Sequence, residues 1–237
     1  MAYKFSASRA AQLMTCPGSA DLEKSIPGWV APVVDESAGR KGQGSFMHGL
    51  LEQSATLTPR DMEHLAEAMM YVAQLRRTRR FKILTEQVQV AEWLPSKPQT
   101  TPDVVLYTTD ELHIIDYKAG KILVETTDNV QGLFLAMTHA HLSPKAKGVT
   151  FHIVQPWAGN IDSWFIDIPT LLKFRDEAID IDNRILAGDT TLVPSDNCKF
   201  CPAYPHSRGD KGSPLCPAAM RVLYPMPGPD EDAILDL

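Results

Sequence analysis

The stretch TPDVVLYTTDELHIIDYKAGK, Thr101–Lys121, decides the fold. Its alternating apolar residues predict two short strands joined by a turn. Asp103 opens the first strand, Asp116 closes the second, and Lys118 follows two residues later. Burying a charge in a sheet costs free energy unless the charge is paired or holds a metal. Three charged residues at the ends of apolar strands therefore indicate a paired or metal-binding site.

In a tight antiparallel pair the two strand ends lie side by side, so Asp103 and Asp116 are expected to be neighbours. The period of two places Asp116 and Lys118 on one face. Two carboxylates suit Mg²⁺ or Mn²⁺, and a lysine can steady a water or offset phosphate charge. The pattern indicates metal-assisted phosphodiester hydrolysis. A bare Asp-x-Lys is also typical of a surface ion pair.

The run Pro102-Asp103 followed by Asp116-Tyr117-Lys118-Ala-Gly resembles the core of the PD-(D/E)XK nuclease superfamily, and in particular its RecB-like branch. The resemblance implies that Asp103 and Asp116 are the catalytic metal ligands. It also implies that the main-chain carbonyl of Tyr117 is a further ligand and that Lys118 is the catalytic lysine.

Two helices are similar to helices of the same branch. Gly44, His48 and Glu52 follow the pattern G-x-x-x-H-x-x-x-E, which implies that His48 joins the metal and that Glu52 supports the site. Gln131 matches a glutamine that the same branch carries in the helix after the hairpin. The match implies that Gln131 contacts DNA or the active site. Leu135 departs from the tyrosine usual four residues later.

The chain has four cysteines, the number that makes one complete tetrahedral or cluster ligand set, although Cys16 would also suit a small buried hydrophobic position. Cys198, Cys201 and Cys216 lie near the end of the chain, and Cys16 lies near its start. The segment SASRAAQLMTCP resembles the opening of nucleases of the AddB and CRISPR-adaptation types, which implies a structural [4Fe–4S] cluster held by all four. Zn²⁺ is the second choice, either on the four thiols or on the three late cysteines with His206.

The bulk composition favours a folded intracellular protein. The chain has 237 residues, 44% of them hydrophobic, and a net charge of −6. No apolar run approaches the ~20 residues of a membrane helix, and the N-terminus lacks the apolar core of a signal peptide. We therefore expect the cytoplasm of a bacterial host cell and no membrane partner. The negative charge argues against indiscriminate binding of nucleic acid.

The order of predicted elements indicates an α/β fold, with a central mixed β-sheet flanked by helices. We expect a single nuclease domain over 1–237, in which 1–44 and 190–237 form the cluster-binding part around a 45–189 core. The final 40 or so residues read as loops. Helices are predicted at 6–16, with a serine N-cap, 45–56, 59–80, 127–142 and 169–187, and strands at 82–91, 103–108, 111–117, 148–155 and 162–168.

The expected substrate is DNA, as single strands or duplex ends. Arg9, Arg76 and Arg77 are candidate phosphate contacts, although the last two also suit a solvated helix end. Trp29, Trp93 and Trp157 suit either base stacking or the core. Because no base-reading motif is visible, an exonuclease is preferred to a sequence-specific enzyme.

Two alternatives belong to other classes. In the first, the chain is a catalytically inactive nuclease-fold module that binds DNA or organises an assembly. In the second, it is an interaction protein stabilised by a zinc site, and the acidic residues of the hairpin are ordinary surface charges. A compact nuclease of this kind suits phage-type recombination or repair beside a strand-annealing protein.

Overall fold

The structure is a computed structural model that describes residues 5–23, 59–118, 120–201, 203 and 216–223. The chain divides into two compact units. The first comprises Met1–Phe5, Arg9–Trp29 and Asp180–Leu237, and the second comprises Ser6–Ser8 and Val30–Ile179. The hairpin belongs to the second unit, called the sheet unit, and all four cysteines belong to the first, called the cysteine unit.

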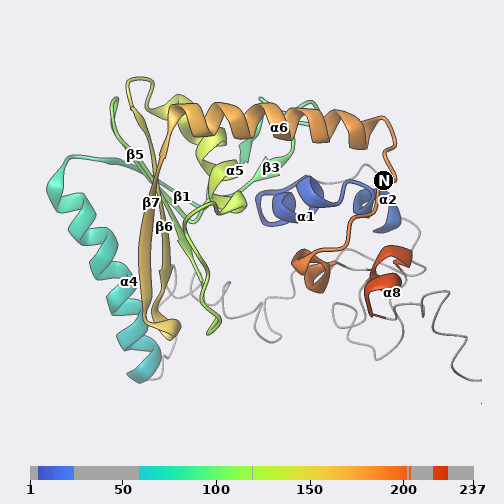
Figure 1. The fold of residues 1–237 in the computed structure, drawn as a ribbon. Helices are drawn as coiled ribbons and strands as arrows, with labels where there is room; N and C mark the ends of the chain where they lie inside the picture. The colour runs from blue at the N-terminus through green and yellow to red at the C-terminus, as the bar shows by residue number, and fades with distance from the viewer. Residues whose placement is uncertain (1–4, 24–58, 119, 202, 204–215, 224–237) are drawn as a thin grey trace, which may run out of the picture. The chain divides into compact units, whose positions relative to one another are not determined.

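The sheet unit is built on a five-stranded sheet in the order β1-β4-β5-β6-β7 (Figure 1). Strands β5 and β6 pair in parallel and the other neighbours pair antiparallel, so the sheet is mixed as expected. Two short strands, β2 and β3, pair separately. The strands are β1 Lys82–Thr85, β2 Gln89–Val90, β3 Gln99–Thr100, β4 Val104–Tyr107, β5 Leu112–Tyr117, β6 Gly148–Gln155 and β7 Asn160–Asp167.

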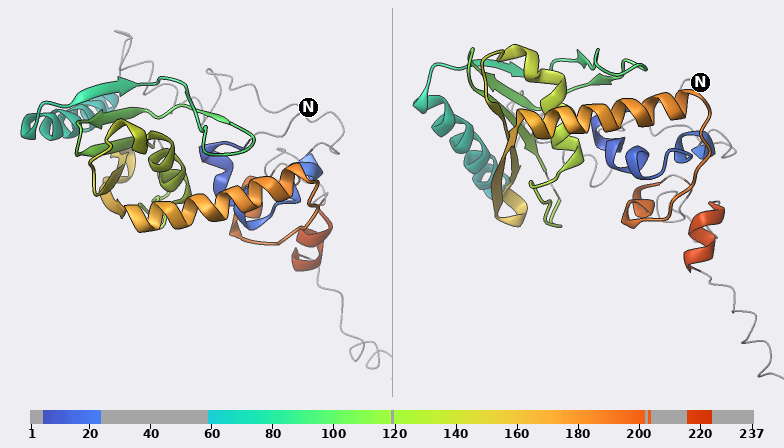
Figure 2. Two further views of the ribbon diagram at one scale, coloured as in Figure 1. Left: turned by 90° about the horizontal axis from the view of Figure 1, so that it is seen from above. Right: turned by 45° about the horizontal axis from the view of Figure 1, so that its top comes forward.

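Helix α4, Pro59–Thr78, covers one face of this sheet (Figures 1 and 2). Proline is favoured at a first helical position, because its missing N–H has no partner there anyway. Leu65 and Ala68 of α4 are buried against apolar side chains of β4, β5 and β6. Burial of such side chains contributes about 1.5–3 kcal/mol for each large one. The strand residues of this cluster are Val104, Leu106, Ile115, Tyr117 and Val154.

Helix α5, Val130–His139, lies on the opposite face (Figure 2). Its N-cap Asn129 accepts a 2.9 Å hydrogen bond from the backbone N–H of Gly132. A Cβ on Gly132 would lie 2.5 Å from the ring of Phe151, so glycine lets α5 approach β6 closely. A 3-10 turn, η3 Ala140–Leu142, follows α5, and α6, Ile168–Leu186, follows β7. Trp93 packs between Phe134 of α5 and Phe174 of α6.

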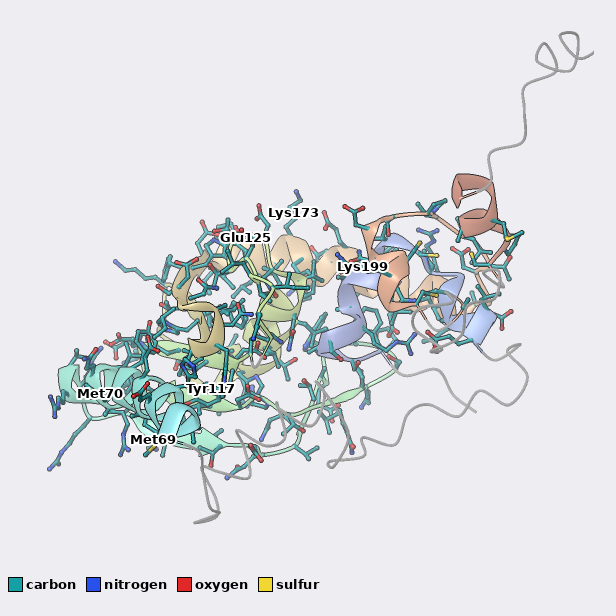
Figure 3. The ribbon with its side chains drawn as sticks, turned by 90° about the horizontal axis from the view of Figure 1, so that it is seen from below. Met69, Met70, Tyr117, Glu125, Lys173 and Lys199 are labelled. Carbon is teal, nitrogen blue, oxygen red and sulfur yellow. The ribbon has the colours of Figure 1, made fainter. Side chains whose placement is uncertain are left out.

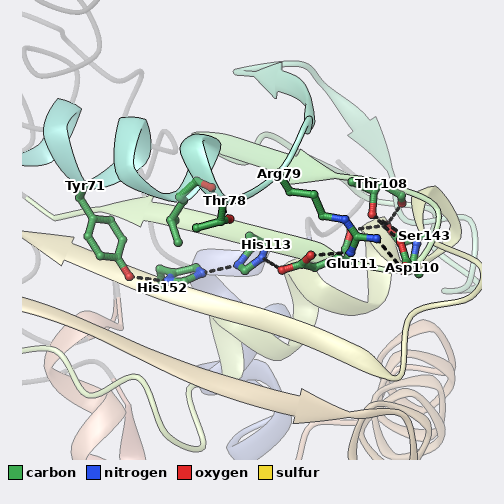
Figure 4. Close-up of polar contacts among 10 residues, drawn as sticks. Tyr71, Thr78, Arg79, Thr108, Asp110, Glu111, His113, Ser143 and His152 are labelled. Atoms are coloured by element: carbon green, nitrogen blue, oxygen red, sulfur yellow. Dashed lines mark hydrogen bonds and ion pairs between the residues drawn. The ribbon is translucent and has the colours of Figure 1, made fainter.

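A chain of polar contacts lies on the α4 face (Figure 4). The hydroxyl of Tyr71 is 2.8 Å from Nδ1 of His152, and Nε2 of His152 is 2.9 Å from Nδ1 of His113. Nε2 of His113 is 2.8 Å from Glu111, whose other oxygen accepts a 2.8 Å hydrogen bond from Arg79. These contacts satisfy polar groups that would otherwise be costly to bury.

The cysteine unit brings the start and the end of the chain together. Its described elements include α1 Ala10–Thr15, α2 Ser19–Leu22, η5 Asp196–Phe200 and α8 Pro217–Leu223. The backbone N–H of Gly18 donates a 2.9 Å hydrogen bond to the carbonyl of Thr191. A Cβ on Gly18 would lie 2.5 Å from the carbonyl of Thr190, so only glycine permits this contact without a backbone shift.

The structure corrects three local predictions. The strand expected at 82–91 is broken, because Glu86 adopts a left-handed φ of 48° between β1 and β2. No serine caps α1, whose N-cap is Arg9 without a side-chain bond, after the 3-10 turn η1 Ala7–Arg9. The terminal segment expected to be loops contains η5 and α8. The helix predicted at 45–56 lies outside the described residues.

Among the residues described, no helix combines the length and the apolar character that a membrane crossing requires.

Candidate active site and cysteine pocket

The two acidic residues of the hairpin face one another. Val104 pairs with Ile115, and continuing this antiparallel register by one residue sets Asp103 opposite Asp116. The backbone N–H of Tyr117 donates a 2.6 Å hydrogen bond to Oδ2 of Asp103. The two carboxylates are therefore held at neighbouring strand ends, as the sequence predicts.

Lys118 and Gln131 complete this cluster. Nζ of Lys118 lies 2.7 Å from Oδ2 of Asp116 and donates a 2.9 Å hydrogen bond to Oε1 of Gln131. The amide nitrogen of Gln131 donates a 3.0 Å hydrogen bond to Oδ1 of Asp116. One side chain of α5 therefore fixes both a carboxylate and the lysine. We call Asp103, Asp116, Lys118 and Gln131 the acidic cluster.

The acidic cluster holds more negative than positive charge when both acids are ionised. Asp116 is 5% exposed, and half-buried Asp103 lies against it. Burial and the neighbouring Asp116 carboxylate raise the pKa of Asp103 to about 7, against the opposing pull of the Tyr117 N–H and Lys118. Two close carboxylates with one lysine form an environment in which a divalent cation would be strongly favoured.

A buried glutamine fixes the loop that follows Lys118. The amide nitrogen of Gln155, which is fully buried, donates 2.7 Å hydrogen bonds to the carbonyls of Gly120 and Ile122. Its oxygen accepts a 3.3 Å hydrogen bond from the N–H of Val124. The loop thereby presents Ile122 and Leu123 to solvent, with exposed fractions of 79% and 62%.

The donor set suits a hard cation. Carboxylate oxygens and a main-chain carbonyl such as that of Tyr117 are the ligand types that Mg²⁺ and Mn²⁺ prefer. In the described part of the chain, no group of three or more His, Cys, Asp or Glu is arranged to hold a metal ion. His48 and Glu52, the remaining predicted members of the site, lie outside the described residues.

The predicted arginine contacts occupy varied positions. Arg9 forms an ion pair with Glu23 in the cysteine unit. Arg76 and Arg77 are exposed in the last turn of α4, whereas nearby Arg79 pairs with Glu111 and Asp110.

Of the tryptophans that suited base stacking, Trp93 packs between aromatic rings and donates a 3.1 Å hydrogen bond to Thr138. Trp157 packs against the α4-face core. Both therefore serve packing, whereas Trp29 lies outside the described residues.

The four cysteines line one pocket of the cysteine unit. None of them forms a disulfide. Cys16 lies at the end of α1, Cys198 and Cys201 lie in and after η5, and Cys216 immediately precedes α8. The structure therefore brings together the early and late cysteines that the sequence groups as one ligand set.

Backbone N–H groups point at two of the sulfurs. Val193 donates to Sγ of Cys16 and Ser195 donates to Sγ of Cys198, both at 3.3 Å. Burial raises the pKa of Cys16 and raises that of Cys201 to about 11, so a positive charge would be needed to favour their thiolates. Hydrogen bonds to sulfur are a common feature of metal-bound thiolates.

Sequence reasoning missed the role of Gln155. It stands at the end of β6 after two apolar residues, Ile153 and Val154, and an amide buried in such a position needs hydrogen-bond partners. The partners, Gly120 to Val124, lie on the connection after β5, so the pairing of β5 with β6 was needed to find them.

Several crystal structures are similar to this chain. An alkaline exonuclease from Laribacter hongkongensis is 10% identical, with 78% of this chain and 88% of that chain covered and a TM-score of 0.39. The same enzyme in complex with dAMP is 12% identical over the same shares, also with a TM-score of 0.39. A "Putative exonuclease" from Eubacterium rectale is 14% identical, with 94% of each chain covered and a TM-score of 0.47.

A family model described as "Protein of unknown function (DUF2800)" matches residues 53–215. This match covers most of the chain, including β1 to β7 and both aspartates of the acidic cluster. The chain belongs to the DUF2800 family.

Proposed function

We propose that this protein is a metal-dependent DNA exonuclease of the PD-(D/E)XK type, which hydrolyses phosphodiester bonds at DNA ends. The observation that carries the proposal is the acidic cluster. Two opposed carboxylates, a lysine and a bridging glutamine meet at adjacent strand ends within hydrogen-bonding distance. This combination matches the chemical needs of phosphodiester hydrolysis.

Asp103, Asp116 and the carbonyl of Tyr117 would hold Mg²⁺ or Mn²⁺, with His48 as a further ligand. Such a cation lowers the pKa of a bound water and offsets charge on the phosphate. Lys118 would orient the attacking water and stabilise negative charge on the phosphate oxygens. Gln131 keeps Lys118 and Asp116 in a fixed relation, so neither side chain has to be ordered during the reaction.

Two further observations support DNA ends as the substrate. The net charge of −6 disfavours broad coating of a duplex, which leaves local recognition near the acidic cluster. The loop that follows Lys118 exposes Ile122 and Leu123, and these apolar side chains would be free to contact bases. In this proposal the enzyme acts in phage-type recombination or repair, beside a strand-annealing protein.

We further propose that Cys16, Cys198, Cys201 and Cys216 hold a structural [4Fe–4S] cluster. All four thiols line one pocket of the cysteine unit, and four cysteine thiolates are the usual ligand set of a [4Fe–4S] cluster. Zn²⁺ on the same thiols is the second choice. The cluster would tie together chain segments that are far apart in sequence.

The nuclease proposal is tested with protein purified without oxygen and DNA labelled at either the 5′ or the 3′ end. Single-stranded and duplex substrates are incubated with Mg²⁺, with Mn²⁺ or with a chelator. The proposal predicts metal-dependent shortening that Asp103→Asn and Asp116→Asn each abolish. Folded protein that shortens none of these substrates would favour the inactive DNA-binding module instead.

Metal analysis tests the cluster separately. A [4Fe–4S] protein is brown and carries about four irons per chain, whereas a zinc site is colourless. Cys216→Ser should lower the iron content while the residues of the acidic cluster are unchanged. Stoichiometric zinc in protein purified without oxygen from iron-supplemented cells would reject the iron–sulfur assignment.

A further inference from the structure

The sheet unit contains a cavity that adjoins the acidic cluster through Gln131. Its volume is about 250 Å³, and it is partly open to solvent. Gln131, which bonds to both Asp116 and Lys118, forms part of its wall. Thr101, two residues before Asp103, forms another part.

The chemistry of the wall is neutral and hydrogen-bonding. The lining side chains in the described part of the chain carry no charge. Hydroxyls and amides both donate and accept hydrogen bonds. They are contributed by Ser6, Ser8, Gln99, Thr100, Thr101 and Gln131. Val88, which is 59% exposed, and buried Leu135 add apolar surface.

This wall does not suit a phosphate. Recognition of phosphate normally uses arginine, lysine or converging backbone N–H groups, and the cavity is lined by uncharged side chains beside two carboxylates. A flat, neutral group with polar edges fits it better. Hydroxyls rotate to suit a partner, so such a wall can accept the edges of different bases.

Resting on the proposed nuclease function, we propose that this cavity is a base subsite. It receives the nucleobase of the nucleotide next to the scissile phosphate, with Val88 and Leu135 against the ring and Gln99 and Thr101 at its polar edge. The subsite holds the end of the strand in register with the acidic cluster while accepting all four bases. It therefore positions the substrate without reading sequence.

The test compares an intact strand end with an end whose terminal nucleotide lacks its base. Wild-type protein should cleave the intact end about tenfold more efficiently, the size of effect that one or two lost hydrogen bonds produce. In the double variant Gln99→Leu, Thr101→Val this preference should fall to within about twofold. The matched control Gln74→Leu, Thr109→Val changes the same residue types at exposed positions outside the cavity and should keep the full preference.

Binding separates this subsite from the catalytic proposal. Lys118→Ala protein is titrated with the same fluorescent oligonucleotides, so that no cleavage is required. The subsite predicts that Lys118→Ala protein binds the baseless end more weakly than the intact end, and that adding Gln99→Leu and Thr101→Val abolishes this difference. That result would support the subsite even if the wild-type protein cleaved nothing.

Two results would overturn the subsite while leaving the nuclease proposal intact. One is active wild-type enzyme with no preference for the intact base. The other is a double variant that loses discrimination between 5′-phosphate and 5′-hydroxyl ends while keeping its preference for the base, which would make the cavity a phosphate site.

Discussion

The amide nitrogen of Gln131 lies 3.0 Å from Oδ1 of Asp116, so helix α5 meets strand β5 at a buried carboxylate. The same side chain accepts a hydrogen bond from Lys118, which itself pairs with Asp116. Three side chains therefore form a closed set of contacts, in which Gln131 restrains the ion pair of Lys118 and Asp116 from one side. Such supporting hydrogen bonds determine how well a metal site keeps its geometry.

Gln131→Leu tests this arrangement. Leucine retains much of the side-chain volume but removes both hydrogen bonds, so that Lys118 and Asp116 keep only their ion pair and lose the amide that restrains them. We expect DNA cleavage to fall by about 10–100-fold, and the Mg²⁺ concentration for half-maximal activity to rise. Rates measured over a series of Mg²⁺ concentrations give both quantities. Gln74→Leu, at an exposed position of α4, is the control, and equal rates in the two variants would contradict the positioning role.

Gln155 supplies a second prediction. Gln155→Leu removes the hydrogen bonds to Gly120, Ile122 and Val124 and leaves those backbone groups without this partner. We expect the free energy of unfolding to fall by about 1–3 kcal/mol, as for other unsatisfied buried groups. Urea denaturation measures this change. Amide hydrogen exchange should also accelerate at 120–124, and unchanged exchange there would show that the glutamine does not fix the loop.

The paired histidines predict a pH dependence of stability. Burial and the neighbouring His113 lower the pKa of His152 to about 3, while Tyr71 occupies its other nitrogen. An unfolded histidine takes up a proton below about pH 6.5, so between these values the unfolded state binds more protons. The free energy of unfolding should therefore rise with pH from about 3 to about 6.5, and this contribution is fully present above 6.5.

Between pH 5 and pH 6.5 the expected change from His152 is about 2 kcal/mol. It is measured by urea denaturation of wild-type protein and of His152→Gln, which cannot titrate. The variant should show a flatter dependence in this window. Parallel curves for the two proteins would mean that His152 is not the group responsible.

A substitution of Gly18 tests whether the close backbone contact near Cys16 is needed for the cysteine unit. Alanine would place Cβ 2.5 Å from the carbonyl of Thr190, so the backbone near Cys16 must move. We expect Gly18→Ala to lower bound iron and to reduce stability by about 1–3 kcal/mol. Gly120→Ala is the control for iron content, since its Cβ would come no closer than 3.8 Å to the Gln155 side chain. Full iron loading in Gly18→Ala would contradict this account.

Much of the sheet unit could be predicted because its signals are local. Alternation and turn residues predict β4 and β5, and β6 occupies the predicted range 148–155. The opposition of Asp103 and Asp116 follows from antiparallel pairing at a tight turn. The spacing of Cys198 and Cys201 predicts that they lie close together, and the resemblance of the Cys16 segment to iron–sulfur nucleases implies that Cys16 joins them at one pocket.

Other features depend on contacts between distant segments. The break at Glu86 arises where its N–H meets the carbonyls of Pro102 and Asp103, a contact that periodicity does not contain. His113 and His152 meet only because β5 and β6 pair in parallel. The base subsite similarly combines segments near residues 6, 99 and 131, which no local motif connects.

Lys118→Ala tests the central claim most directly. Lys118 pairs with Asp116 in the acidic cluster, whereas Lys173 is 78% exposed on α6 and serves as the matched control (Figure 3). Release of mononucleotides from end-labelled DNA is measured for wild-type, Lys118→Ala and Lys173→Ala proteins with Mg²⁺. We predict loss of at least about 100-fold in Lys118→Ala alone. Equal release by all three proteins would contradict the assignment of the acidic cluster as the catalytic site.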